Sequence, residues 1–342
     1  MSEDNLSKKG KLFEPRDAKL YKPRNSYGNT GAQFYVAKNP EYGAVFTYHL
    51  KDMPKTSKSK RIQSERKLNS DKKDVPFPGY DAISKEMNEK PASIILTIKD
   101  SEGNHIRNVK KNASNGSGRI AWNLRHKSYF PVRAGSSGPR WGYFNPSGPY
   151  VTPGEYHAEF YLENNGSVEK LDGPISFNVK PLRKGTLEGA SYDDYNSFRI
   201  RVSNLYIEMS KYQDEFNMMK TKIELLDKAS LQLETFSPEI MKKISDFKTK
   251  YNAFDSETDG NPAKAEIGEW DKPSISMRTQ IAMQGLSTSY GPTDLNKSNL
   301  DIAEKLFDKL ALDVKMFKSE LESLENEVKE LNPPHLSGSG IN

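Results

Sequence analysis

An acidic run in the second half of the chain has the spacing of a calcium-binding loop. Its carboxylates and turn glycine are Asp255, Glu257, Asp259, Gly260 and Glu266, the last being twelfth when the first is counted as one. Calcium takes oxygen ligands at alternate positions, a glycine at the sharp turn and a carboxylate at the loop's end. Pro262, however, falls where such a loop extends. We therefore expect a solvated loop between helices, with calcium as the alternative and no other cofactor.

A second group with binding chemistry is the ring-rich segment 129–150. The residues that could contact a ligand there are Tyr129, Arg140, Trp141, Tyr143, Phe144 and Tyr150. Exposed rings can stack on sugar faces, and an arginine can donate hydrogen bonds to hydroxyls. Rings in a glycine-rich loop more often form the loop's own core or pack against a neighbouring domain. Packing is the expectation, and glycan binding stays open as the alternative.

The sequence lacks the signatures of catalysis. Its five histidines are scattered, without the spacing that places two zinc ligands on one helical face. It contains no G-x-S-x-G elbow, no P-loop and no G-x-G-x-x-G after a strand. It also has no cysteine, which excludes disulfides, thiolate zinc sites and cysteine nucleophiles. We therefore predict no catalytic residue in this chain.

The positive charge is concentrated in one segment. Residues 54–74 hold eight Lys or Arg and three Asp or Glu, a net charge of +5 that equals the excess of all 342 residues. Such a run could bind nucleic-acid phosphate or an anionic surface. The run contains no ring for base stacking, so we expect a solvated helical insertion over 52–90 and no nucleic-acid partner. No stretch approaches the roughly 20 apolar residues of a membrane span.

Alternating apolar and polar residues predict strands in the first half of the chain. The pattern is found over 44–50, 93–99, 119–125, 156–163 and 175–180. Period two with one apolar face is typical of strands packed on a single side. The sequence therefore predicts an antiparallel, fibronectin- or Ig-like β-sandwich over 11–182, after a flexible start at 1–10.

The second half changes to a period of three and a half. One apolar seam contains Phe198, Val202, Leu205, Met209, Tyr212, Phe216, Met219, Ile223 and Leu226. The other contains Leu300, Ala303, Phe307, Leu310, Val314, Phe317, Leu321, Leu324, Val328 and Leu331. After a linker at 183–190, these seams predict an antiparallel three- or four-helix bundle over 191–332, with a flexible tail at 333–342. An intermolecular coiled coil is the competing arrangement.

Candidate caps mark where these helices begin. Ser191, Ser237 and Ser298 each precede a helical pattern, and a further helix is expected from Ser274 to about Ser289. The chain as a whole is therefore expected to be a multidomain α+β protein.

Several blocks of sequence resemble one known family. They include 39–51 (NPEYGAVFTYHLK), 90–98 (KPASIILTI), 118–125 (GRIAWNLR) and 148–156 (GPYVTPGEY). These blocks resemble the region that follows the propeller in bacterial sortilin-like BNR-repeat proteins, often labelled glycosyl hydrolases. The family's propeller repeats carry S-x-D-x-G-x-x-W boxes, and this sequence contains none. The resemblance therefore transfers no catalytic residue.

The resemblance implies a function and a location. It predicts a non-catalytic accessory module that packs on a propeller domain, or on a separately encoded propeller protein, within an envelope complex. The alternative is part of a secreted glycoside hydrolase or glycan-binding protein that uses the loop 129–150. Family members are exported to the periplasm, outer membrane or cell surface. The printed sequence shows no export signal, so a cytoplasmic location stays open as well.

Overall fold

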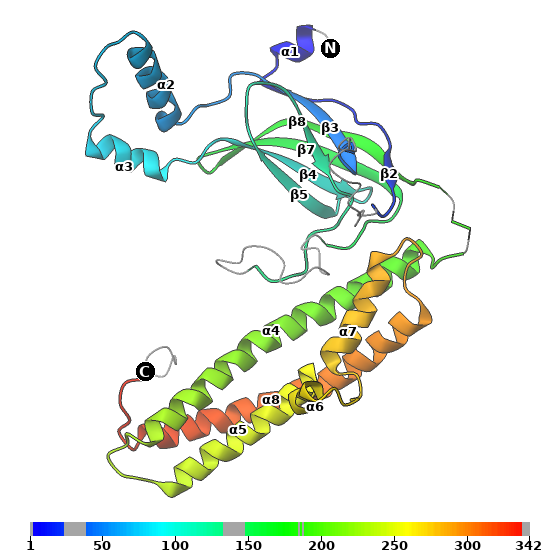
Figure 1. The fold of residues 1–342 in the computed structure, drawn as a ribbon. Coiled ribbons are helices and arrows are strands. Elements are labelled where there is room, and N and C mark those ends of the chain that lie inside the picture. Colours follow the sequence, from blue (N-terminus) through cyan, green and yellow to red (C-terminus); the bar gives the residue numbers. More distant parts are fainter. Residues whose placement is uncertain (1–2, 24–38, 133–147, 184, 187, 337–342) are drawn as a thin grey trace, which may run out of the picture. The chain divides into compact units, whose positions relative to one another are not determined.

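The computed structural model describes residues 3–23, 39–132, 148–183, 185–186 and 188–336 of an α+β protein (Figure 1). The chain divides into two compact units. The sheet unit comprises residues 1–128 and 147–186, and the helical unit comprises 129–146 and 187–342. Residues 129–132, which the sequence places in the β-sandwich domain, group with the helices instead.

The described part of the sheet unit contains two sheets. The smaller has the order β1-β3-β6 and is antiparallel, with β1 at Gly10–Leu12, β3 at Ala44–Leu50 and β6 at Gly116–Trp122. The larger has the order β2-β8-β7-β4-β5, with β2 at Ala18–Leu20, β8 at Ser167–Pro181, β7 at Gly154–Asn164, β4 at Ser93–Asp100 and β5 at His105–Asn112. The prediction of purely antiparallel pairing is wrong at one edge, where β2 runs parallel to β8.

The two sheets share one apolar core. Along β3 the buried side chains alternate, as the sequence predicts for a strand with one apolar face. Rings from the two sheets meet in this core: the centroids of Phe46 and Phe177 are 5.1 Å apart, and those of Tyr48 and Phe160 are 5.6 Å apart. The predicted strand at 119–125 ends early, at Trp122, because Leu124 has a φ of +56° that a strand does not accommodate.

Two helices lie between β3 and β4, where the helical insertion is predicted. They are α2 at Ser57–Ser70 and α3 at Tyr80–Asn88, and residues 57–88 are called the helical arm below (Figure 1). Thr56 caps α2 by accepting a hydrogen bond from the Ser59 amide at 3.1 Å. Another short helix, α1 at Glu3–Ser7, precedes β1.

The described helices of the helical unit are α4 at Tyr192–Ser230, α5 at Pro238–Asp259, α6 at Pro262–Glu266, α7 at Ile275–Gln284 and α8 at Asp294–Lys329, with a 3-10 turn at Gly285–Ser287. The predicted caps Ser191, Ser237 and Ser274 each accept an amide hydrogen bond in the first turn of their helix. The prediction for the last helix is wrong. Its cap is Thr293, five residues before Ser298, because Thr293 and Asn296 form a reciprocal capping box there.

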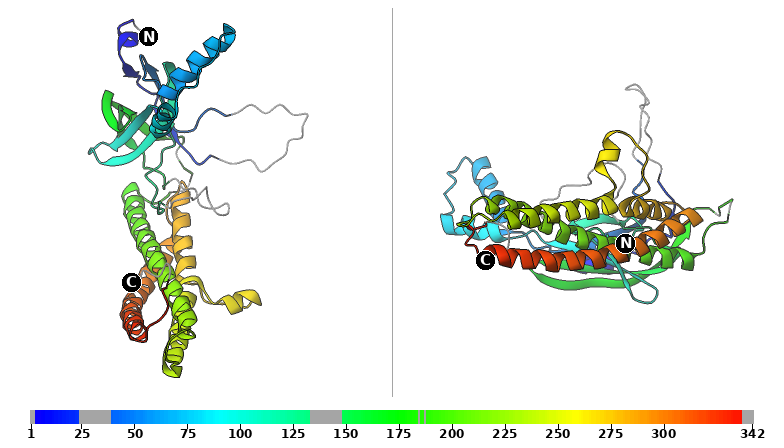
Figure 2. Two further views of the ribbon diagram at one scale, coloured as in Figure 1. Left: turned by 90° about the vertical axis from the view of Figure 1, so that its left-hand side faces the viewer. Right: turned by 90° about the horizontal axis from the view of Figure 1, so that it is seen from below.

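Both predicted seams enter one core. Every seam residue is buried except Met209 and Leu331, which pack partly buried against the same cluster. The direction of the helices follows from their ion pairs. Arg201 with Glu304, Glu215 with Lys318 and Lys222 with Glu325 are each 103 positions apart, so α4 and α8 run parallel. Lys243 pairs with Glu327 and Lys250 with Glu320, so α5 runs antiparallel to α8. Figure 2 shows these long helices lying side by side.

Candidate functional site

The structure divides the predicted aromatic site between the two units. Tyr129 belongs to the helical unit, where its ring stacks on Phe130 at 4.9 Å and meets Tyr206 of α4 edge-on at 5.3 Å. Tyr150 belongs to the sheet unit, where it is buried and the Arg125 guanidinium lies 3.7 Å over its ring. The remaining predicted residues, Arg140, Trp141, Tyr143 and Phe144, lie outside the described residues. Both described rings therefore take part in packing.

The predicted acidic loop is helical instead. Asp255, Glu257 and Asp259 lie in the last turns of α5, Gly260 ends that helix, and Glu266 is the last residue of α6. The expectation of a loop is wrong because Phe254 and Thr258 pack inward, which keeps this segment helical despite its loop-like composition. On a helix, positions 255 and 259 share a face and position 257 points elsewhere.

Two of the acidic side chains interact with other parts of the helical unit. Burial, and then the charge of Asp259, raises the pKa of Asp255. Asp259 accepts a hydrogen bond of 2.5 Å from Ser276 of α7. Within the described ranges, no group of three or more His, Asp or Glu side chains is placed to hold a metal ion. Calcium binding here stays an untested hypothesis without the loop geometry that motivated it.

A charge cluster that the sequence did not reveal lies on the larger sheet. Glu159 of β7 is 8% exposed, and its carboxylate oxygens lie 2.7 Å from the Nζ atoms of Lys170 on β8 and Lys99 on β4. Tyr161 donates a third bond at 3.0 Å. The hydrogen bonds from Lys170 and Lys99 lower the pKa of Glu159 to about 2.

This cluster is suited to holding strands together. A general acid or base works best with a pKa near the operating pH, and Glu159 is far below that range. Its three partners come from β4, β7 and β8, so the carboxylate joins three neighbouring strands. The sequence signal was an acidic residue at an outward position of a central strand, which is indistinguishable from an ordinary solvated charge.

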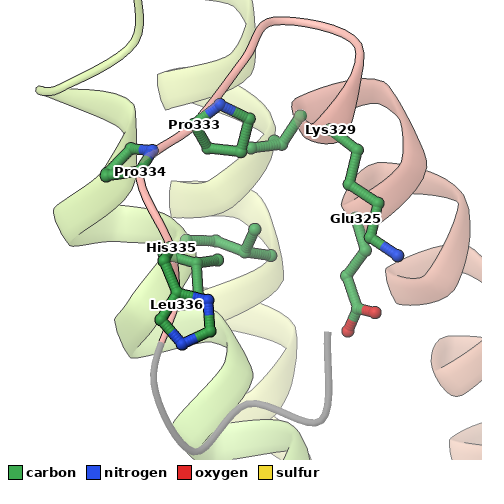
Figure 3. Close-up of a pocket in the computed structure, with 8 residues that line it drawn as sticks. Glu325, Lys329, Pro333, Pro334, His335 and Leu336 are labelled. Atoms are coloured by element: carbon green, nitrogen blue, oxygen red, sulfur yellow. The ribbon is translucent and has the colours of Figure 1, made fainter. Parts of the chain in front are cut away.

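A small cavity of about 150 Å³ lies at the end of the helical unit (Figure 3). It is lined by Leu226, Glu325, Val328, Lys329, Pro333, Pro334, His335 and Leu336. Glu325 is 7% exposed, and the Nζ of Lys222 lies 2.8 Å from its Oε1. Sites for organic ligands usually measure about 300–1,000 Å³, so this cavity is small for a substrate. Leu336 packs against the helical core beside it, which indicates a structural role for the segment 333–336.

The basic run lies on the helical arm, as predicted, and has few carboxylate partners. Arg61 pairs with Glu65 at 2.6 Å and with Glu86 at 2.7 Å. The other Lys and Arg side chains of 54–74 form no ion pair with any residue that the structure describes. Lys55 precedes α2, Lys72 and Lys73 follow it, and the others lie on this helix, which buries none of its residues. This surface is therefore available to an anion.

Apolar side chains also remain exposed on the long helices after their seams are filled. On α8, Leu295, Ile302 and Leu306 are 66%, 40% and 42% exposed. Their spacings of seven and four place them on one face of the helix, outside the seam. On α4, Ile200 and Ile207 are 50% and 37% exposed. In the sequence these residues are hidden by the stronger repeat of the buried seams.

Two further findings bear on function. No helix in the described part of the chain combines the length and the apolar character that crossing a membrane requires. The chain matches none of the known protein-family models, and a comparison with curated proteins gives no match either.

Proposed function

We propose that this chain is a non-catalytic docking module of an exported, sortilin-like BNR-propeller protein. In this proposal a β-sandwich and an antiparallel helical bundle pack on the propeller and present a protein-binding surface within an envelope complex. The observation that carries the proposal is the exposed apolar stripe on α8, formed by Leu295, Ile302 and Leu306.

The stripe is an unusual feature for a helix whose core side is complete. Leu300, Ala303 and Phe307 already fill the seam over the same turns of α8, all at 7% exposure or less. The exposed side chains Leu295, Ile302 and Leu306 therefore add no packing to that core. Exposed apolar groups that recur on one face are typical of surfaces that bind another protein.

The sandwich-and-bundle interpretation is supported by the packing inside each unit. Rings from both sheets meet in one core, as two facing sheets require. The helices α4 and α8 run parallel, and α5 and α7 both run antiparallel to α8, so the directions along the chain are up, down, down and up. Such a scaffold holds the outer face of α8 rigid, which suits a docking surface.

The charge clusters also favour docking over catalysis. Glu159 is held ionised by two lysines, and Glu325 is paired with Lys222. Groups that are neutralised by fixed partners stabilise a fold but are poorly suited to proton transfer. The proposal therefore assigns reactive chemistry, if the complete protein has any, to the propeller.

The test uses a separately expressed sortilin-like BNR propeller and the full chain in a calorimetric binding assay. We expect binding, and we expect Ile302→Ser combined with Leu306→Ser to weaken it by about tenfold or more, since each buried apolar side chain contributes about 1.5–3 kcal/mol. Ile200→Ser with Ile207→Ser on α4 is the matched control and should bind like the wild type. Failure of the wild-type chain to bind would contradict the proposal. Glycan-array binding lost in Trp141→Ala would favour the glycan-binding alternative.

A further inference from the structure

The helical arm combines its unpaired cations with exposed apolar side chains. Phe77, Tyr80 and Met87 are 62%, 84% and 82% exposed, and Val75 is 38% exposed. The rings of Phe77 and Tyr80 meet edge-on with centroids 5.0 Å apart. All four residues lie in α3 or in the turn that joins it to α2. All four residues follow the basic run 54–74 in the chain, so the composition of that run alone does not include them.

The packing of α3 on α2 keeps its apolar face outward. Glu86 faces α2, where Arg61 donates hydrogen bonds of 2.8 and 2.7 Å to its two oxygens. Tyr80 and Met87 lie about 100–120° around the helix from Glu86, and both are exposed, whereas Ile83 lies closer to Glu86 and is half-buried. The contact between Arg61 and Glu86 therefore joins the two helices and leaves Tyr80 and Met87 exposed.

The cations lie next to this apolar face in the chain. Lys72 and Lys73 occupy the turn before Val75, and Lys58, Lys60, Arg66 and Lys67 lie on α2. All six are exposed, and none pairs with a carboxylate among the residues that the structure describes. Charge complementarity therefore calls for an anionic partner that also accepts projecting rings and a methionine.

We propose that the helical arm binds the surface of a lipid bilayer that contains anionic lipids. Its lysines would contact the headgroups, and Phe77, Tyr80 and Met87 would enter the boundary between headgroups and acyl chains. Aromatic and apolar side chains flanked by Lys and Arg are the composition of interfacial anchors. This inference is independent of propeller docking, which uses α8.

A bilayer fits the arm better than other anionic partners do. Phe77 and Tyr80 form one exposed pair of rings, and Met87 is exposed further along α3. A bilayer receives such side chains without needing a matching pocket for each. A nucleic acid would satisfy the lysines, but Val75 and Met87 have no stacking role on bases. An acidic protein would need its own apolar sockets at the spacing of these residues.

The experiment measures binding of the full chain to vesicles by flotation. The vesicles contain phosphatidylcholine alone or phosphatidylcholine with phosphatidylglycerol. We expect binding only to the anionic vesicles, weakened by added salt. Lys72→Gln with Lys73→Gln should lower the partition coefficient by about 30-fold, since each such charge is worth about 1 kcal/mol near an anionic surface. Phe77→Ser with Tyr80→Ser should lower it by about tenfold or more.

Matched control variants distinguish specific binding by the helical arm from non-specific adsorption of the protein to vesicles. Trp270→Ser removes a ring that is 80% exposed in the helical unit, and Lys242→Gln with Lys248→Gln removes two exposed charges from α5. Both should bind like the wild type. In Phe77→Trp, anionic vesicles should shift the added fluorescence to shorter wavelength. Equal binding to neutral vesicles, equal losses in the control variants, or retention on DNA or polyglutamate without vesicle binding would each overturn the proposal.

Discussion

The sheet unit and the helical unit each bury a carboxylate beside lysine, but they satisfy it differently. Glu159, 8% exposed, has Lys99, Lys170 and Tyr161 on its two oxygens. Glu325, 7% exposed, has Lys222, which donates to Oε2 at 3.1 Å and lies 2.8 Å from Oε1. Oε1 makes no hydrogen bond within the described residues.

This difference reflects how the two units are assembled. The partners of Glu159 join strands that are distant in sequence, so a complete network helps to fix their register. The helical unit obtains its order from seams with a regular local spacing, so its buried carboxylate Glu325 can be paired with one lysine alone. We therefore expect core packing to dominate the helical unit, and charge to matter more in the sheet unit.

The largest expected effect comes from truncating one core ring in each unit. Phe216 is fully buried between Tyr212 and Tyr251, with centroids 5.3 and 4.0 Å away, and Phe46 is fully buried in the core that the two sheets share. Phe216→Ala and Phe46→Ala should each lower the free energy of unfolding of their own unit by about 3–5 kcal/mol, and both variants keep Trp122 as the fluorescent reporter of the sheet unit. Urea unfolding followed by far-UV circular dichroism and tryptophan fluorescence measures this. Equal shifts of both signals in each variant would show that the units unfold as one.

Next in size is the removal of the lysine that pairs with Glu325. Lys222→Met leaves a buried carboxylate without its cation, and we expect a loss of about 2–3 kcal/mol. Adding Glu325→Leu should recover most of that loss, because both charges are then gone. Lys318→Met, which faces the 57% exposed side chain of Glu215, is the control and should cost less than about 1 kcal/mol. No recovery in the double variant would mean that Lys222 acts through packing.

The complete network around Glu159 predicts a pH dependence. Its pKa is lowered from 4.5 to about 2 by hydrogen bonds from Lys170 and Lys99. A lowered pKa in the folded state contributes stability that is fully present above the unfolded value and is lost as the pH falls through this range. Between about pH 6 and pH 3 we expect Glu159→Gln to lose less stability than the wild type, by about 2 kcal/mol. Denaturant titrations at several pH values measure it, with exposed Glu155→Gln as the unaffected control.

The sequence predicted the helical core nearly residue by residue because a seam repeats within a few turns. The strands were harder. β1 and β2 have three residues each, too few for an alternating pattern to be recognised. β5, an edge strand, buries only Ile106 fully, and Val109 packs partly buried against the same core, so its alternating pattern is weak. The parallel pairing of β2 with β8 depends on distant contacts that no local pattern records.

Local patterns also limited what the sequence could say about the candidate sites. The acidic segment at 255–259 has a loop-like composition, but Phe254 and Thr258 give it a helical core face. The lysine partners of Glu159 lie 60 positions before it and 11 positions after it, so spacing could not reveal the cluster. On the helical arm, the basic run 54–74 is defined by charge alone and ends before Phe77 and Tyr80.

The smallest effect concerns the start of α8, where the predicted cap was wrong. Thr293 accepts a hydrogen bond from the Asn296 amide, and the Asn296 side chain accepts one of 2.9 Å from the Thr293 amide. Thr293→Ala should therefore cost about 1 kcal/mol. Ser298→Ala lies at an exposed helical position and should be neutral or slightly stabilising, by about 0.5 kcal/mol at most. Thermal unfolding of the two variants distinguishes the caps, and a larger loss in Ser298→Ala would mean that the helix begins where the sequence alone placed it.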